Sequence, residues 1–255
     1  MRRRTYLTTA GITLAALAGC TSSEGDTEDV DTPTDDETEA QDDSNDENTD
    51  TETETEEETT EVSSGEAAIE ITEHELVVDE GDYSTDVYVL ATVENTGDAA
   101  SGQINLTAEW YDDSGNFLDN DDAYLASLGA GETWSARVFY LGSDGGQVAD
   151  YEFSGEFNTE PPADPDGLEL TTSELQVGED TAVISGEVAN NRDESVSYVE
   201  AVGKFYDGDG VVLKSDMTNV SDFPAGETWS FEVEALGHVR YDAIADHEVI
   251  ITTGL

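Results

Sequence analysis

The chain has few side chains that could act as catalysts. Its only histidines are His74, His238 and His247, and Cys20 is its only cysteine. Nucleophilic or acid–base catalysis needs a constellation of His, Cys or carboxylate groups held in a pocket, and a copper centre needs His, Cys and Met together. None of the histidines recurs in both halves of the internal repeat described below. We therefore predict no catalytic residues, no cofactor and no enzymatic activity.

Two acidic segments are candidate metal sites. Residues 112–116 (DDSGN) and 207–210 (DGDG) are oxygen-rich, like calcium-binding loops. However, both lack the full calcium-loop spacing with its distal Glu. Asp, Asn, Ser and Gly are also the residues that tight turns between strands require. We therefore predict that both segments are hairpin turns and that the chain has no metal site, while calcium binding stays the alternative.

Cys20 is a candidate for covalent modification by lipid. Residues 17–20 (LAGC) resemble the lipobox of bacterial and archaeal lipoproteins, in which small residues admit a peptidase and the Cys thiol takes the lipid. The resemblance implies a two-chain anchor, which holds a protein stably at a membrane, whereas one chain holds it only marginally. The alternative is a thiol at the end of an ordinary secretory signal.

The residues before Cys20 are typical of an export signal. Arg2, Arg3 and Arg4 precede a short apolar run over 10–18, which is far below the roughly 20 residues that span a bilayer. Residues 3–7 (RRTYL) resemble a twin-arginine motif, which implies export of a folded chain. We expect a signal peptide over 1–19 and a location on the outer face of the cytoplasmic membrane.

The composition is extremely acidic. There are 62 Asp and Glu residues against eight Lys and Arg, and the formal net charge is −54. Nucleic acids and anionic membrane surfaces both attract clustered Lys and Arg, so neither is an expected partner of the folded part. Acidity with almost no Lys resembles the proteins of halophilic archaea, whose medium screens such repulsion.

The segment 20–66 consists almost wholly of Asp, Glu, Thr, Ser and Asn. It has no aromatic residue and little to bury, so it cannot offset the entropy of ordering. We predict a lipid-anchored, disordered acidic linker here, which would hold the rest of the chain away from the membrane.

The remainder of the chain is an internal duplication. Residues 130–135 (AGETWS) recur identically at 225–230, and most of the two copies align at an offset of 95. We place the first copy at 67–158, a Pro-rich linker at 159–167 and the second copy at 168–255. These copies are called the first and second repeat below.

Apolar and polar residues alternate along each repeat. Ile104, Leu106, Ala108 and Trp110 are separated by polar residues, and this period of two is typical of strands with one buried face. Several short strands with turn signals in about 90 residues are typical of an immunoglobulin-like sandwich. The predicted fold class is all-β, with two tandem immunoglobulin-like β-sandwich domains after the acidic linker.

Both repeats resemble the FxLYD family of small extracellular domains found in prokaryotic lipoproteins. The resemblance rests on three successive elements: 93–95 (VEN) or 188–190 (VAN), then 109–112 (EWYD) or 204–207 (KFYD), then the Gly-Glu-Thr-Trp-Ser segment. Only the aromatic, Tyr and Asp character of the name-giving motif is kept. The resemblance implies a β-sandwich and supplies no catalytic residues.

Two kinds of surface feature are candidate sites. Asn105 and Asn219 begin glycosylation sequons; we expect Asn105 on an outward strand face and Asn219 in a loop. Val196, Tyr198 and Val202 replace polar residues of the first repeat and are predicted to form an outward apolar stripe. Such a stripe marks an interface, either with the first repeat or a C-terminal segment, or with an external partner.

We therefore expect a non-catalytic, lipid-anchored cell-surface protein. Its tandem domains would bind or space other envelope components, either protein or glycan. The alternative is an accessory lipoprotein that captures a solute or metal ion for a transporter, and a hydrolytic enzyme is the third hypothesis. Solute capture would require a concave pocket with converging polar groups.

Overall fold

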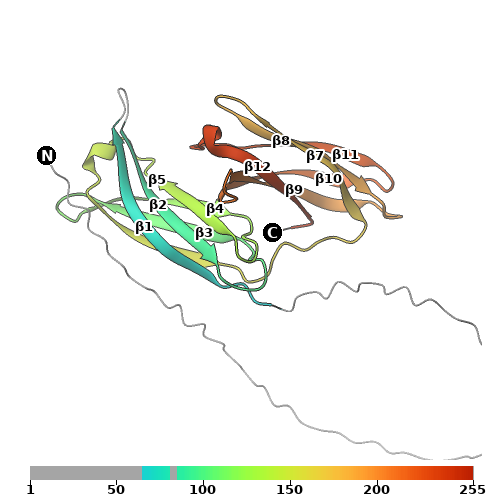
Figure 1. Ribbon diagram of the computed structural model, residues 1–255, viewed down its shortest axis with the longest axis horizontal. Helices are drawn as coiled ribbons and strands as arrows, with labels where there is room; N and C mark the ends of the chain where they lie inside the picture. The colour runs from blue at the N-terminus through green and yellow to red at the C-terminus, as the bar shows by residue number, and fades with distance from the viewer. Residues whose placement is uncertain (1–64, 81–84, 255) are drawn as a thin grey trace, which may run out of the picture. The chain divides into compact units, whose positions relative to one another are not determined.

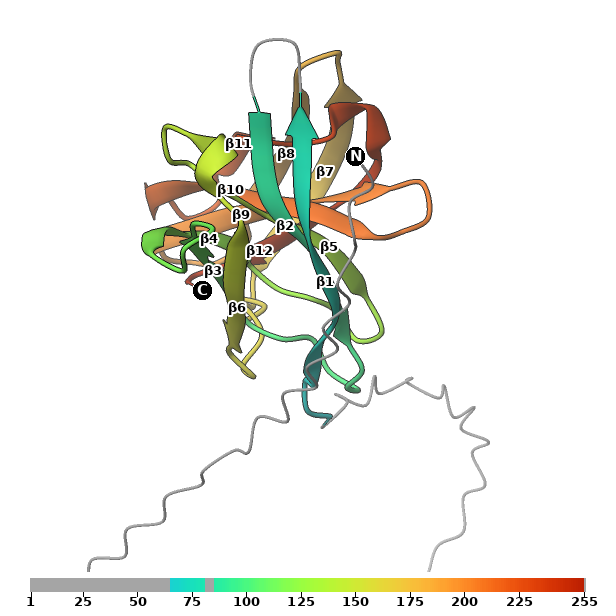
Figure 2. The same ribbon diagram turned by 90° about the vertical axis from the view of Figure 1, so that its left-hand side faces the viewer.

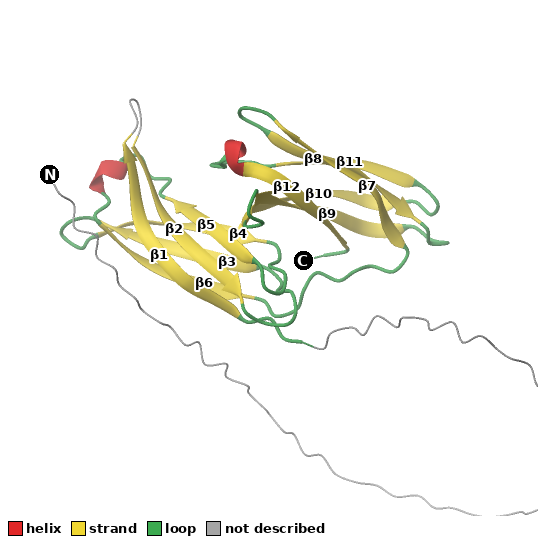
Figure 3. Cartoon of the chain, viewed as in Figure 1, coloured by secondary structure: helices red, strands yellow, loops and turns green. Residues whose placement is uncertain are grey.

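The computed structural model describes residues 65–80 and 85–254 (Figure 1). These residues form an all-β structure whose only helical pieces are the short 3-10 turns η1 (Gly145–Gln147) and η2 (Tyr241–Ala243), as Figure 3 shows. In the described ranges, no helix has the length and apolar character needed to cross a membrane. The predicted all-β sandwich fold is confirmed.

The strands of the first repeat pair in two groups of three. One group has the order β1-β2-β5 and the other β4-β3-β6, and all neighbours are antiparallel. The strands are β1 (Ile69–Glu80), β2 (Thr85–Asn95), β3 (Ile104–Tyr111), β4 (Phe117–Leu125), β5 (Thr133–Phe139) and β6 (Asp150–Phe157).

The second repeat has the same arrangement. Its groups have the orders β7-β8-β11 and β10-β9-β12, again with antiparallel neighbours. The strands are β7 (Leu168–Val177), β8 (Ala182–Asn190), β9 (Val196–Asp207), β10 (Val212–Phe223), β11 (Thr228–Glu234) and β12 (Ile244–Thr252). Thus β4 and β5 of the first repeat correspond to β10 and β11 of the second.

Each repeat has its own hydrophobic core between its two groups of strands. In the first repeat the alternate residues of β2 are buried, in the pattern Val87, Val89, Ala91 and Val93, and pack with those of β3. In the second repeat, Ile184 and Val188 of β8 belong to one cluster with Val199, Ala201 and Phe205 of β9. The alternation in the sequence therefore places one face of each strand in a core.

One sheet runs from the first repeat into the second. Its six strands have the order β1-β2-β5-β10-β9-β12, and Figure 2 shows the strands from a second direction. The connection between β5 and β10 is a parallel bridge between Trp134 and Val212. The side chains of both residues are buried, at 2% and 0% exposure.

Both acidic segments are hairpin turns, as predicted. The Asp112 carboxylate accepts hydrogen bonds from two backbone N–H groups of its turn at 2.9 and 2.8 Å, and Asp207 does the same at 3.0 Å. Hydrogen bonds from Asn116 lower the pKa of Asp112. Gly115 and Gly210 have φ values of 77° and 81°, a region that favours glycine.

In each repeat, a buried asparagine side chain makes hydrogen bonds to the backbone of several loops. The Asn95 side chain, 1% exposed, accepts from the N–H groups of Ala68 and Gly97 and donates to the carbonyls of Ala99 and Leu128. Its counterpart Asn190, also 1% exposed, accepts one backbone hydrogen bond and donates to three carbonyls. Both asparagines end a core strand, so each links a strand end to neighbouring loops.

Candidate functional site

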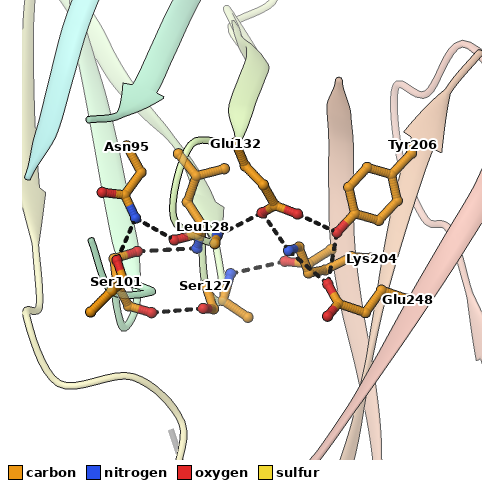
Figure 4. A network of polar contacts seen from close by, with 12 residues as sticks. Asn95, Ser101, Ser127, Leu128, Glu132, Lys204, Tyr206 and Glu248 are labelled. Atoms are coloured by element: carbon orange, nitrogen blue, oxygen red, sulfur yellow. Dashed lines mark hydrogen bonds and ion pairs between the residues drawn. The ribbon is translucent and has the colours of Figure 1, made fainter. Parts of the chain in front are cut away.

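The most unusual polar group of the described chain is Lys204, in the middle of β9. Strand alternation directs Phe205 into the core of the second repeat, so Lys204 lies on the opposite face. Its side chain is only 2% exposed, and its Nζ lies 2.6 Å from Glu132 Oε2 and 2.9 Å from Glu248 Oε2. Glu132 belongs to the first repeat and Glu248 to β12, so the ammonium joins the two repeats (Figure 4).

Tyr206 completes this cluster on the same face of β9. Its hydroxyl oxygen lies 2.7 Å from both Glu132 Oε1 and Glu248 Oε2. A phenol has one hydrogen, so it donates to one carboxylate at a time. Burial, together with the hydrogen bonds to Glu248 and Glu132, raises the pKa of Tyr206. The raised pKa favours the protonated phenol, which is the form that donates to the carboxylates.

The pKa of Glu248 is set by opposing effects. Burial raises it, but the hydrogen bonds from Lys204 and Tyr206 and the Lys204 charge outweigh burial, so the pKa lies below its ordinary value. The cluster therefore favours the ionised form of Glu248. We call Lys204, Glu132, Tyr206 and Glu248 the junction cluster.

Backbone contacts hold Glu132 in position. Glu132 Oε2 also accepts from the N–H of Gly129 at 2.6 Å, within its own turn. Beside this turn, the Ser101 hydroxyl accepts from the N–H of Leu128 at 3.1 Å, and the Ser127 hydroxyl donates to the Ser101 carbonyl at 2.7 Å. Figure 4 shows Ser101, Ser127 and Leu128 beside the residues of the junction cluster. The acceptor of the Lys204 ammonium is thus positioned by contacts within the first repeat.

Further contacts join the repeats on either side of the cluster. The N–H of Ala126 donates to the hydroxyl of Ser215 at 2.9 Å, and Ser215 is 1% exposed. At the end of β5, the rings of Phe139 and His238 stack with their centroids 4.2 Å apart and an interplanar angle of 19°. Within the first repeat, the Arg137 guanidinium lies over the Tyr88 ring at 5.0 Å.

The junction cluster is suited to holding two parts of a chain together. Its ammonium is enclosed by carboxylates and a phenol, and its side chain has almost no exposure to solvent. A lysine in these surroundings is not accessible as a nucleophile. Its geometry supports a structural ion pair that specifies which surfaces of the two repeats meet.

The predicted outward position is wrong for Val196, whereas the burial of Val202 is compatible with the predicted interface. Val196 is 7% exposed and belongs to the core of the second repeat, and Val202 is 0% exposed in β9. Tyr198 is half-buried, and its hydroxyl donates to Glu200 at 2.7 Å. β9 is buried on both faces. On one face Phe205 packs in the core of the second repeat, and on the other face Lys204 and Tyr206 contact Glu132 of the first repeat.

The two sequons lie on strands. Asn105 is half-buried in β3, between Tyr124 and Glu156 on the neighbouring strands. Asn219 is exposed, as a glycan requires, but the expected loop is wrong: Asn219 lies in β10 and pairs with Glu200. The apolar and β-branched residues around Asn219 continue the strand up to Phe223.

The remaining candidates are dispersed. His74 hydrogen-bonds the Tyr151 hydroxyl at 2.8 Å, and burial lowers its pKa, whereas His247 lies 3.1 Å from the Ser173 hydroxyl. Trp110 and Trp134 are core residues as predicted, and Trp229 is half-buried. Over residues 65–80 and 85–254, no three His, Cys, Asp or Glu side chains are grouped so as to hold a metal ion. Cys20, the signal peptide and the acidic linker up to residue 64 lie outside the described residues.

A shallow hollow of about 720 Å³ lies on the group β7-β8-β11. Its lining is mixed, with hydroxyl groups, carboxylates and one core aromatic ring. The lining residues are Thr172, Ser173, Glu174, Ser185, Gly186, Glu187, Ser230, Phe231 and Glu232. Its three carboxylates, of Glu174, Glu187 and Glu232, come from three different strands.

Lys204 was not among the residues singled out from the sequence. One signal for it was present: Lys204 is among five basic residues beyond the first four positions, and it stands in its strand between Val202 and Gly203 on one side and Phe205 on the other. Its counterpart in the first repeat is Glu109. A charge reversal between two copies of one unit indicates that the copies have different surroundings.

Comparisons with known proteins identify no relative that bears on function. No family model and no curated protein matches the chain. Among solved structures, a transglutaminase of red sea bream is 12% identical with a TM-score of 0.21, covering 65% of this chain and 27% of that protein. A calcium-binding mutant of β-glucuronidase 2 from Bacteroides uniformis is 15% identical with a TM-score of 0.21, covering 71% and 28%. The chain spans less than a third of either protein.

Proposed function

We propose that this protein is a non-catalytic surface lipoprotein whose joined repeats bind or space other components of the cell envelope. The lipid would be attached at Cys20, on the outer face of the cytoplasmic membrane. The acidic segment 20–66 would then act as the tether. In this proposal the repeats are FxLYD-like units of a halophilic archaeal protein.

The observation that carries the proposal is the junction between the repeats. A continuous six-stranded sheet, a buried ammonium and a buried Trp134–Val212 bridge connect them. A binding or spacing protein benefits from such a connection, because a fixed pair of units presents its surfaces at a defined separation.

The test begins with the anchor. The full chain is expressed in a halophilic host as wild type and as Cys20→Ser, and both are followed by cell fractionation in molar KCl. Wild type is expected in the membrane fraction, accessible to protease added outside the cell, and Cys20→Ser in the soluble fractions. Equal membrane retention of both chains would contradict lipid anchoring.

The second step tests envelope binding. Intact cells are crosslinked in their native brine, and the products of wild type and of Cys20→Ser are compared by mass spectrometry. Binding predicts one recurrent envelope component crosslinked to residues of the repeats in the anchored chain. If wild type is crosslinked to as many different proteins as Cys20→Ser is, with none recurring, the result would contradict a specific partner.

A further inference from the structure

The two halves of the six-stranded sheet each have a counterpart in the other repeat, and these two counterparts form separate three-stranded sheets. The six-stranded sheet consists of β1-β2-β5 from the first repeat and β10-β9-β12 from the second. The two other sheets, β11-β8-β7 and β4-β3-β6, are the corresponding groups of the opposite repeats. Because β11 corresponds to β5 and β4 corresponds to β10, the same connection could form between β11 of one chain and β4 of a second copy.

The apolar part of the connection is retained at these edges. Phe117 of β4 stands where β10 has Val212, and Trp229 of β11 stands where β5 has Trp134. Val212 is 0% exposed, whereas Phe117 is 55% exposed and Trp229 is half-buried. An aromatic pair therefore remains available at the two edges.

The polar part differs in one charge. The junction cluster has Glu132, Lys204, Tyr206 and Glu248. Its counterparts are Glu227, Glu109, Tyr111 and Glu152. Three of the four positions keep their residue type, and the ammonium is replaced by a carboxylate.

This reversal changes the sign of the interaction. Within the chain, Lys204 lies between two carboxylates at 2.6 and 2.9 Å. In the equivalent contact between copies, Glu109 would face Glu227 of the next chain beside Glu152 of its own, with no ammonium between them. Like charges brought together across an interface disfavour the complex strongly.

We infer that the sheet edge at β4 of one chain and the sheet edge at β11 of a second copy could pair with each other. We call these two edges the latent docking pair, and we infer that repulsion from Glu109 prevents them from associating. The contact would be head-to-tail, and head-to-tail contacts that do not close a ring produce open chains. Glu109 thus restricts the connection to the two repeats of one molecule. The inference concerns self-association and does not depend on the proposed envelope function.

The test is a charge-exchange cycle at the latent pair. Glu109→Lys places an ammonium opposite Glu227, and Glu227→Lys places one opposite Glu109 and Glu152. Full-length chains, all carrying Cys20→Ser to exclude association through lipid or disulfide, are compared in 3 M KCl by sedimentation velocity. The parent chain is expected to be a monomer. Each single variant is expected to raise the weight-average mass about two-fold or more as concentration increases, because head-to-tail growth is open.

Two controls separate docking from general relief of charge. The double variant Glu109→Lys/Glu227→Lys, which restores like charges, should be a monomer again. Glu156→Lys makes the same charge change on an exposed residue of β6 and should also leave a monomer. The inference is overturned if both single variants stay monomeric while circular dichroism shows them folded, if the double variant or Glu156→Lys associates equally, or if the parent already associates. If one single variant does not fold, the other decides.

Discussion

Lys204 shows how a buried charge can be accommodated in a small β-sandwich. An ammonium that is 2% exposed has lost its hydration, and this loss is compensated only by close ionic partners and hydrogen bonds. Its partners Glu132 and Glu248 stay 24% and 49% exposed. They keep part of their own hydration, so the ion pairs form at a lower desolvation cost than a fully buried triad.

The first prediction concerns removal of this ammonium. Lys204→Met keeps most of the side-chain volume but leaves the carboxylates of Glu132 and Glu248 facing each other. We expect a loss of about 3 kcal/mol in the free energy of unfolding, which for a chain of this size lowers the melting temperature by about 6–12 °C. Thermal unfolding in 3 M KCl, followed by circular dichroism, measures it.

Lys214→Met is the matched control for this prediction. Lys214 Nζ lies 3.4 Å from Asp216, and its side chain is 28% exposed. Lys214 is more exposed than Lys204 and has one carboxylate partner at a longer distance, so this variant should lose less stability than Lys204→Met. Equal losses of stability in the two variants would show that the junction cluster contributes no more to the free energy of unfolding than the Lys214–Asp216 pair does.

The second prediction concerns pH. Because the folded pKa of Glu248 lies below the ordinary value of 4.5, its contribution to stability is fully present above pH 4.5 and is lost as pH falls through the folded pKa. The difference in melting temperature between wild type and Glu248→Gln should therefore be largest at pH 5–7 and shrink in more acidic buffer. Melts in 3 M KCl across this range provide the measurement, and a constant difference would contradict it.

At the scale of elements, the local pattern predicted the strands well. Alternating apolar residues in β2, β3 and β11 indicate which face is buried, because one face of each strand meets the core of its own repeat. The acidic turns could also be predicted from local sequence, because Asp side chains hydrogen-bond nearby backbone groups and Gly adopts the positive φ that a tight turn requires. These features depend on neighbours that are close in sequence.

The features that the sequence left open depend on distant contacts. The residue pattern of β9 contains the Val196, Tyr198 and Val202 stripe, but alternation does not say what covers its second face. Glu132 covers part of it from 72 residues away along the chain. The strand position of Asn219 was missed because Ser and Asn near Pro224 suggested a loop, whereas pairing with β9 extends β10 to Phe223.

The third prediction concerns the asparagines that tie strand ends to loops. Asn95→Ala and Asn190→Ala each remove several hydrogen bonds and leave buried backbone groups without partners. We expect each variant to lose about 3 kcal/mol of stability. Asn191→Ala is the control, because its exposed side chain makes one hydrogen bond, to Glu169. Thermal melts that place all three variants together would contradict the role of the buried asparagines.

At the scale of the whole molecule, three of the few cations, Lys204, Arg137 and Arg240, take part in interactions between the repeats. Of the five basic residues beyond the first four positions, Lys204 lies in the junction cluster, and Arg137 interacts electrostatically with Arg240 and Asp242 across the repeats. Acidic residues outnumber basic ones by 62 to eight, so there are too few cations to pair with most of the carboxylates. Their mutual repulsion opposes the compact state unless salt screens it.

The last prediction follows from this imbalance. The Debye length falls from about 10 Å at 0.1 M salt to about 3 Å at 1 M, so repulsion between surface carboxylates should weaken steeply over this range. The melting temperature of the full chain is therefore expected to be lower by several degrees or more in 0.1 M KCl than in 3 M KCl. Sorbitol at the osmolality of the concentrated salt is the control, because it leaves the charges unscreened and should recover little of the difference. An unchanged midpoint in the two KCl solutions would contradict adaptation of this surface to brine, and full recovery in sorbitol would assign the effect to exclusion of solute from the protein surface instead of to screening.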